Sequence, residues 1–222
     1  MFSLKNRSIA EFAGTAVLVM VSAGSGIMGT ALSSDVGLAL LIDMLATVMA
    51  LGLLIFFLGP ISGAHLNPIV TSVFVWRRTI SMREAMAYVV AQIAGAITGA
   101  VTANVMFDQR AFQVATQTRS SVGLWIGEVI ASAGLIIVIF VLIDRSSPQL
   151  ISIAVPVWIG SAYFFTSSAS FANPAVTIGR QFTNTFTGIA PSSVAGYVVA
   201  EFIGAVIGAL LVRALRQPDA TK

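Results

Sequence analysis

Two stretches decide how this chain folds: NPIVT at residues 67–71 and NPAVT at residues 173–177. Asn is a strong helix N-cap because its side-chain oxygen accepts a hydrogen bond from an otherwise unpaired backbone N–H. Pro is favoured directly after it, where its missing N–H costs nothing. Each stretch therefore predicts the start of a helix. Within a membrane, two such starts in corresponding halves of a chain indicate a pore or binding site near the bilayer midplane, faced by the positive ends of both helix dipoles.

The composition indicates an integral membrane protein. Hydrophobic residues make up 57% of the 222 residues and charged residues only 9%, whereas soluble domains carry about 25% charged residues. The mean hydropathy is +0.93. The net charge of +3 is small, and no clustered basic face indicates a nucleic-acid partner. Because cysteine is absent and His65 is the single histidine, the sequence predicts no metal site and no cofactor.

Six apolar segments are long enough to cross a bilayer, which takes about 20 helical residues. Two shorter segments, at about 67–77 and 173–183, begin at the Asn-Pro motifs and are too short to cross. We expect an all-α membrane protein with six transmembrane helices and two re-entrant half-helices, in a single transmembrane domain over residues 1–222. The six expected spans are 9–30, 36–58, 84–106, 122–143, 149–168 and 193–215.

The two halves of the chain, about 1–115 and 116–222, resemble each other. Each half contains three full spans, an odd number, so the second half must enter the membrane with inverted topology. Gln92 and Glu201 lie among Gly and Ala, and we interpret them as packing and membrane-end polar groups. The corresponding residues are Glu11 and Glu128, Asn67 and Asn173, and Gln92 and Glu201.

Charge placement predicts the orientation of the chain in the membrane. If the N-terminus is cytoplasmic, nine Lys and Arg residues fall on the inside and three on the outside, as the positive-inside rule requires. Both termini are therefore expected to be cytoplasmic. The nine are Lys5, Arg7, Arg77, Arg78, Arg83, Arg145, Arg213, Arg216 and Lys222, and the three are Arg110, Arg119 and Arg180.

These features resemble the aquaporin, or major intrinsic protein, family over essentially the whole chain. The residues that carry the resemblance are SGAHLNP at 62–68, FANPA at 171–175, and two Glu-x-x-x-Thr/Ser sites that start at Glu11 and Glu128. The resemblance implies the aquaporin fold and a homotetramer in the lipid bilayer with a narrow pore through each subunit. It further implies passive conduction of water or small uncharged solutes, without enzymatic activity.

The resemblance assigns roles to polar residues near the midplane. The side-chain amides of Asn67 and Asn173 can donate to a solute oxygen, and the opposed half-helix dipoles disfavour cations and hydronium. For Glu11 and Glu128, it favours acceptance of backbone N–H groups from the re-entrant loops over a proton relay. His65 either lines the inner mouth or bonds locally. The pore motifs are Asn67, Pro68 and Ile69, and Asn173, Pro174 and Ala175.

One position departs from the pattern of the family. Most relatives place an arginine directly after the second Asn-Pro-Ala, and here that residue is Val176. In the same register, the other three positions of the outer selectivity filter fall on Thr47, Ser161 and Ser170. This set is small, uncharged and poor in donors, which predicts a wide opening without a fixed cation.

A wide filter predicts that water passes without being selected and that larger neutral hydroxylated solutes fit. Undissociated metalloid acids such as arsenous acid resemble polyols in shape and hydroxyl display. The stretch FANPAVTI at 171–178, with Thr47, resembles a bacterial subgroup associated with arsenic resistance, which implies metalloid acids or organoarsenicals as solutes and a location in the bacterial inner (cytoplasmic) membrane. The alternatives are a water- or glycerol-facilitating aquaporin without a metalloid role and, less favoured, a coupled secondary transporter.

Two charged residues lie near this filter in the sequence. Asp43 comes one helical turn before Thr47, and Arg180 comes one turn after Val176, so both are expected on its outer side. We hypothesise that they reach an outer vestibule and pair there. The alternative is that Arg180 extends to the membrane interface and Asp43 caps a loop.

Overall fold

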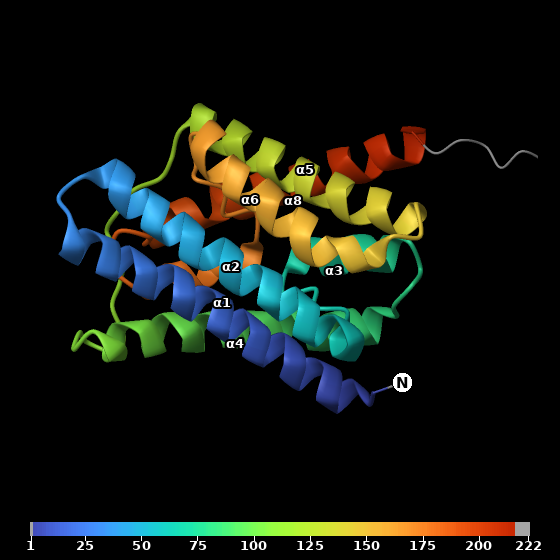
Figure 1. Ribbon diagram of the computed structural model, residues 1–222, viewed down its shortest axis with the longest axis horizontal. Helices are drawn as coiled ribbons and strands as arrows, with labels where there is room; N and C mark the ends of the chain where they lie inside the picture. Colours follow the sequence, from blue (N-terminus) through green and yellow to red (C-terminus); the bar gives the residue numbers. More distant parts are fainter. Residues whose placement is uncertain (1, 216–222) are drawn as a thin grey trace, which may run out of the picture.

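The computed structural model describes residues 2–215. Within these residues the chain forms eight α-helices, one 3₁₀ turn and no strand (Figure 1). The elements are α1 (Leu4–Leu32), α2 (Val36–Ser62), α3 (Pro68–Trp76), α4 (Met82–Met106), α5 (Val122–Asp144), η1 (Pro148–Leu150), α6 (Ile151–Phe165), α7 (Pro174–Arg180) and α8 (Pro191–Leu215).

The long helices confirm the six predicted spans. Each of α1, α2, α4, α5 and α8, and α6 together with η1, is long and apolar enough to cross a membrane. In contrast, α3 has nine residues and α7 has seven, so neither can cross a bilayer. The chain is therefore a multi-pass, all-α membrane protein.

Both short helices start as their motifs predict. The side-chain oxygen of Asn67 accepts a hydrogen bond from the backbone N–H of Ile69 at 3.0 Å. Asn173 does the same for Ala175 at 3.0 Å and for Val176 at 3.4 Å. In both helices the following Pro occupies the first turn, where no N–H is needed.

The long helices run side by side, with α1 packed along α4 and α5 packed along α8 (Figure 1). The start of α1 and the end of α8 lie at the same end of the bundle, as an even number of spans requires. Arg216 and Lys222, two of the nine basic residues expected inside, lie outside the described residues.

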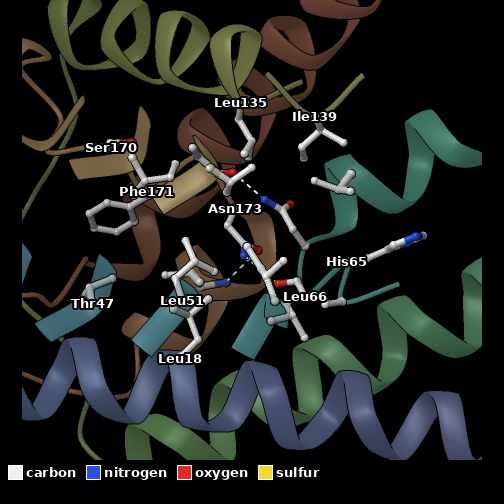
Figure 2. Close-up of a pocket in the computed structure, with 18 of the residues that line it drawn as sticks. Leu18, Thr47, Leu51, His65, Leu66, Leu135, Ile139, Ser170, Phe171 and Asn173 are labelled. Atoms are coloured by element: carbon white, nitrogen blue, oxygen red, sulfur yellow. Dashed lines mark hydrogen bonds between the residues drawn. The ribbon is translucent and has the colours of Figure 1, made fainter. Parts of the chain in front are cut away.

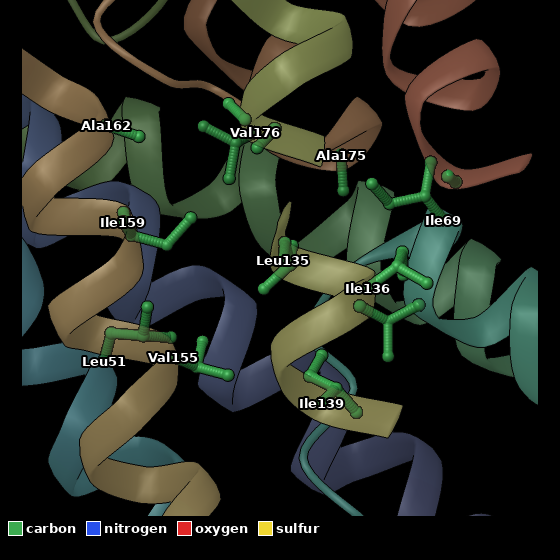
Figure 3. Close-up of a cluster of buried hydrophobic side chains, with 14 of the residues drawn as sticks. Leu51, Ile69, Leu135, Ile136, Ile139, Val155, Ile159, Ala162, Ala175 and Val176 are labelled. Carbon is green, nitrogen blue, oxygen red and sulfur yellow. The ribbon is translucent and has the colours of Figure 1, made fainter. Parts of the chain in front are cut away.

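The centre of the bundle is apolar (Figure 3). Leu135, Ile136 and Ile139 of α5 and Val155 and Ile159 of α6 belong to one buried cluster. The cluster includes side chains of both half-helices and so packs them against the long helices. It also includes Leu51, Ile69, Ala162, Ala175 and Val176.

Glycines allow the paired helices to approach closely. A Cβ on Gly99 of α4 would lie 2.2 Å from the carbonyl oxygen of Ala16 in α1. A Cβ on Gly208 of α8 would lie 2.5 Å from the carbonyl oxygen of Ala133 in α5. Small residues at such contacts are typical of helix pairs in membranes, where close backbone packing replaces the hydrophobic effect.

The contact at Gly99 predicts a specific sensitivity to one methyl group. We expect Gly99→Ala to destabilise the protein by about 1–3 kcal/mol, because backbone must move to admit the Cβ. Gly59→Ala is the matched control: nothing lies within 4 Å of that Cβ position, and Ala favours a helix over Gly by up to about 1 kcal/mol. Thermal unfolding in detergent measures both, and equal melting temperatures would contradict the close contact.

Candidate functional site

The two re-entrant loops meet at the N-termini of α3 and α7 (Figure 2). Asn67 Nδ2 donates to the carbonyl oxygen of Ala172 at 2.7 Å, and Asn173 Nδ2 donates to that of Leu66 at 2.8 Å. Each asparagine thus holds the loop of the other half of the chain. An amide carries two N–H donors, so each side chain keeps a second N–H for another acceptor.

The loops reach these asparagines through left-handed backbone. Ala64 and Leu66 have φ of 46° and 50°, and Ser170 and Ala172, at the corresponding positions, have φ of 51° and 47°. Such conformations cost a non-glycine residue about 1–3 kcal/mol and persist where the surrounding structure holds them. Buried polar side chains from the long helices hold them here.

Glu11 holds the first loop. One oxygen of its fully buried carboxylate accepts from the Ser62 hydroxyl at 2.6 Å and the backbone N–H of His65 at 3.0 Å. The other oxygen accepts from the backbone N–H of Leu66 at 2.6 Å. These are the contacts of a loop anchor, and Glu11 does not line the cavity described below.

Two glutamates hold the second loop. Glu128 accepts from the backbone N–H groups of residues 171 and 172 at 2.9 and 2.7 Å. Glu201 accepts from the backbone N–H of Asn173 at 3.1 Å and from the Thr177 hydroxyl at 2.6 Å. Carboxyl oxygens therefore bind three successive backbone N–H groups of the second loop, those of residues 171–173.

The interpretation of Gln92 and Glu201 as membrane-end polar groups is wrong. Both side chains are fully buried and support the loops. Gln92 Nε2 donates to Glu11 Oε2 at 2.8 Å and to Thr71 Oγ1 at 3.0 Å. The sequence did contain a signal, since Thr71 and Thr177 occupy the same place in the two motifs and each bonds the polar residue of its own half.

Glu201 occupies in the second half the place that Gln92 occupies in the first. Glu201 lies beside Glu128, as Gln92 lies beside Glu11. No N–H or O–H group of the described residues donates to the buried Glu201 Oε2. Glu201 of α8 therefore supports the second loop, as Gln92 of α4 supports the first.

A cavity of about 100 Å³ passes both motifs. Its lining includes Asn67 and Asn173 together with three expected filter residues, Thr47, Ser170 and Val176. These polar and small side chains come from α2, the second re-entrant loop and the half-helices. The cavity is therefore built from both halves of the chain.

The placement of Ser161 in the filter is wrong. Its side chain is exposed, and its hydroxyl donates to the carbonyl oxygen of Val157 at 2.9 Å. The residues of α6 that line the cavity are spaced by four: Ile151, Val155, Ile159 and Tyr163. Ser161 follows Ile159 by two residues, about 200° around the helix, and so lies on the opposite face.

His65 lines the end of the cavity at the start of the first re-entrant loop. Its Nδ1 lies 3.1 Å from Thr71 Oγ1, and its ring packs against Phe74 with centroids 4.3 Å apart. His65 therefore bonds locally, and its side chain also contributes to the cavity wall.

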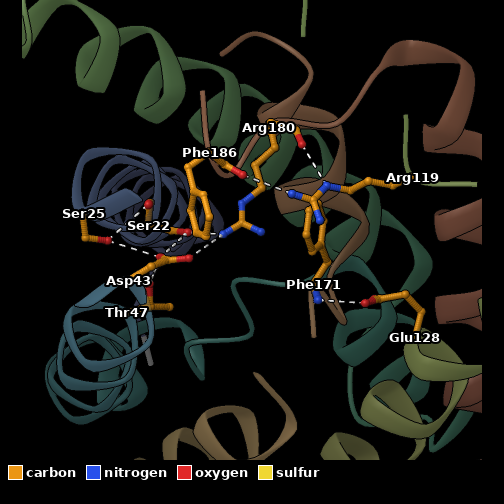
Figure 4. Close-up of polar contacts among 10 residues, drawn as sticks. Ser22, Ser25, Asp43, Thr47, Arg119, Glu128, Phe171, Arg180 and Phe186 are labelled. Atoms are coloured by element: carbon orange, nitrogen blue, oxygen red, sulfur yellow. Dashed lines mark hydrogen bonds and ion pairs between the residues drawn. The ribbon is translucent and has the colours of Figure 1, made fainter. Parts of the chain in front are cut away.

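Asp43 and Arg180 pair at the other end of the cavity (Figure 4). Arg180 Nη2 lies 3.9 Å from Asp43 Oδ2, and both side chains are almost fully buried. Arg180 also donates to the Ser22 hydroxyl, and its guanidinium carbon lies 4.2 Å from the ring centroid of Phe171. Arg180 lines the cavity, so the expectation of an opening without a fixed cation is wrong. Its burial also excludes the alternative that it extends to the membrane interface.

The two hydrogen bonds that Glu201 accepts predict how the protein responds to its substitution. Glu201→Gln keeps the shape of the side chain and an oxygen that can accept from both donors, so we expect it to unfold at about the wild-type temperature. Glu201→Leu leaves the N–H of Asn173 and the Thr177 hydroxyl unpaired and is expected to lose about 1–3 kcal/mol. Thermal unfolding in detergent compares the two variants, and equal losses would contradict the role of Glu201 as an acceptor for the second loop.

The whole chain is similar to known membrane channels. A family model described as "Major intrinsic protein" matches residues 1–171. The aquaglyceroporin AqpS of Rhizobium meliloti (strain 1021) is 44% identical over 217 residues, which cover 98% of this chain and 93% of that protein. The aquaporin AqpM of Methanothermobacter marburgensis is 29% identical, over 95% of this chain and 96% of that protein.

A solved structure shows the same fold. The X-ray structure of the aquaglyceroporin from Plasmodium falciparum matches with a TM-score of 0.76 at 23% identity, over 96% of this chain and 97% of that chain. The matched family model agrees with the architecture described above, six spans and two half-helices whose loops are hydrogen-bonded through their asparagines. The chain belongs to the major intrinsic protein family, whose members are membrane channels and not enzymes.

Proposed function

We propose that the protein is a passive channel for small uncharged solutes that carry hydroxyl groups, together with water. The observation that carries this proposal is the cavity that passes both asparagines and has polar groups on one side and apolar groups on another. The names of two similar proteins, both aquaglyceroporins, agree with glycerol-like solutes.

The cavity wall matches the chemistry of a polyol. Asn67 and Asn173 each keep one free amide N–H that can donate to a solute hydroxyl. The wall formed by α5 and α6 is apolar and includes Leu135, Ile139 and Val155, which suits the C–H edge of the same solute. Because the positive ends of α3 and α7 face the cavity, cations and hydronium are disfavoured there.

Metalloid acids or organoarsenicals are the solutes that we favour for the biological role. Undissociated arsenous acid displays hydroxyl groups as a polyol does, and Val176 leaves more space than the arginine of most relatives. A water- or glycerol-facilitating aquaporin without a metalloid role is the second candidate. A coupled secondary transporter is a weaker third, because the neutral asparagines of the motifs offer no titratable site for a coupled ion.

We further propose a homotetramer in a bacterial inner membrane with both termini cytoplasmic. The exposed apolar side chains of α2, such as Leu45, Met49 and Leu53, suit contact with lipid or with another subunit. The orientation rests on the excess of Lys and Arg at the end of the bundle where the chain starts, since the positive-inside rule places that end in the cytoplasm.

Stopped-flow measurements on proteoliposomes test the solute. We expect gradients of glycerol and of arsenite to relax faster than in empty liposomes. Val176→Arg should slow both by about tenfold, equivalent to ~1.4 kcal/mol, because the longer side chain fills part of the cavity. Val176→Thr, with a similar volume and no charge, is the matched control and should conduct as the wild type does. Wild-type rates equal to those of empty liposomes for both solutes would refute the proposal.

Proton exclusion gives an independent test. The half-helix dipoles face the cavity whatever side chain occupies position 176, so we expect wild type and Val176→Arg to leak protons equally slowly under a pH gradient. A pH-sensitive dye inside the liposomes reports the flux. A wild-type proton flux well above that of Val176→Arg would contradict this prediction, because it would show that the dipoles alone do not exclude protons.

A further inference from the structure

We propose that a second cavity, at the end of the bundle where α1 starts, binds the phosphate headgroup of an anionic phospholipid. This headgroup cavity has a volume of about 420 Å³ and lies near the C-terminal ends of α3, α5 and α8, which lie together at one end of the molecule (Figure 1). It shares no lining residue with the cavity that passes the Asn-Pro motifs. The inference therefore goes beyond the proposed function and does not depend on which solute the protein conducts.

Two arginines line the headgroup cavity. Arg77 directly follows the last residue of α3, and Arg213 lies in the last turn of α8. Of the described residues, no Asp or Glu lines this cavity. Among residues 2–215 no carboxylate pairs with Arg213. Because a guanidinium presents its N–H donors in a fork that matches phosphate oxygens, the cavity suits a phosphate group.

Arg77 is held in place on two sides. Its Nη2 donates to Asp144 at the end of α5, and its guanidinium carbon lies 4.6 Å from the ring centroid of Phe140. Its Nη1 is buried and has no acceptor among the described residues. A buried donor without an acceptor is costly, and we assign a phosphate oxygen in the cavity as that acceptor. Asp144 offsets one of the two arginine charges, so one positive charge remains to balance a phosphodiester.

The surroundings of the headgroup cavity favour a lipid over a soluble phosphate. Apolar side chains of α8, Ala209 and Val212, contribute to its wall. The next residues on α8, Leu210 and Leu211, are exposed, so a surface that suits acyl chains adjoins the cavity. Trp76 also lines the cavity and is exposed, as is typical of tryptophan where a helix meets the membrane–water interface. Basic cavities between membrane helices at that depth are typical sites for anionic headgroups.

A bound headgroup would fasten the half-helix α3 to its neighbours. Arg77 belongs to the end of α3, Arg213 belongs to α8, and Asp144 already joins Arg77 to α5. A phosphate that accepts from both arginines adds a link between α3 and α8. Because a ligand that binds only the folded protein stabilises it, we expect phosphatidylglycerol to raise the unfolding temperature in detergent.

Native mass spectrometry of the purified protein measures which lipids it retains. We expect wild type to retain phosphatidylglycerol in preference to phosphatidylcholine, whose headgroup has no net charge. Arg213→Gln removes one of the two cations and should weaken phosphatidylglycerol binding about fivefold. Arg83→Gln is the matched control, because it makes the same charge change on an exposed residue in the first turn of α4, outside the cavity. It should bind as wild type does.

Two outcomes of this comparison would overturn the inference. Equal retention of the two lipids by wild type would show that the protein does not select the anionic headgroup. Equal binding of phosphatidylglycerol by Arg213→Gln and Arg83→Gln would show that the cavity is not where the lipid is held.

The fluorescence of Trp76 tests the position of the lipid in the wild-type protein. Brominated acyl chains quench tryptophan at short range. We expect brominated phosphatidylglycerol to quench the protein in vesicles more strongly than brominated phosphatidylcholine does. This difference should vanish in Trp76→Phe, which keeps Trp125 and Trp158 and changes an exposed side chain. A difference that persists in Trp76→Phe would place the lipid elsewhere and overturn the inference.

Glycerol 3-phosphate distinguishes a lipid from a soluble phosphate ester. It carries a phosphate group without acyl chains, so we expect an excess of it to leave the quenching by brominated phosphatidylglycerol unchanged. Loss of that quenching would show that the cavity takes a soluble phosphate ester, and it would overturn the assignment to a lipid.

Discussion

Backbone N–H groups of a non-helical loop need acceptors when water is absent, and two such loops lie at membrane depth here. Glu11 binds the N–H groups of residues 65 and 66, and Glu128 binds those of residues 171 and 172. With these groups paired, the loops can keep left-handed backbone, and the carbonyl oxygens of Leu66 and Ala172 can each face the asparagine of the other loop. The two asparagines then hydrogen-bond the halves of the chain to each other, and the cavity lies beside these bonds.

The way in which buried charged side chains are held near the cavity follows from the same constraint. Every buried charge near the cavity is bound either to a loop, as for Glu11, or to a partner of opposite sign, as for Asp43 with Arg180. The cavity is lined by neutral polar groups and by Arg180, which is paired with Asp43, and these face an apolar wall. This distribution explains why a chain with several buried charges presents a cavity suited to uncharged molecules.

Much of the fold was predictable, because six apolar segments and two Asn-Pro motifs each carry a strong local signal. The residues that line the filter were harder to predict. Ser161 was placed by counting along a helix whose rotation the sequence does not fix, and an error of two residues moves a side chain to the opposite face. Arg180 and Asp43 were recognised from helical spacing, but spacing alone could not show that Arg180 lines the cavity. Gln92 and Glu201 were misjudged because small neighbouring residues indicate helix packing as readily as loop support.

We expect a solute to bind between Asn67 and Asn173 on its way through the protein. A crystal structure of the protein soaked in glycerol tests it most directly. We expect solute density in the cavity, with oxygen atoms within hydrogen-bond distance of both side-chain amides while the bonds to Ala172 and Leu66 stay in place. Glycerol bound elsewhere, with the space between the two asparagines closed by other side chains, would show that they do not form the solute site.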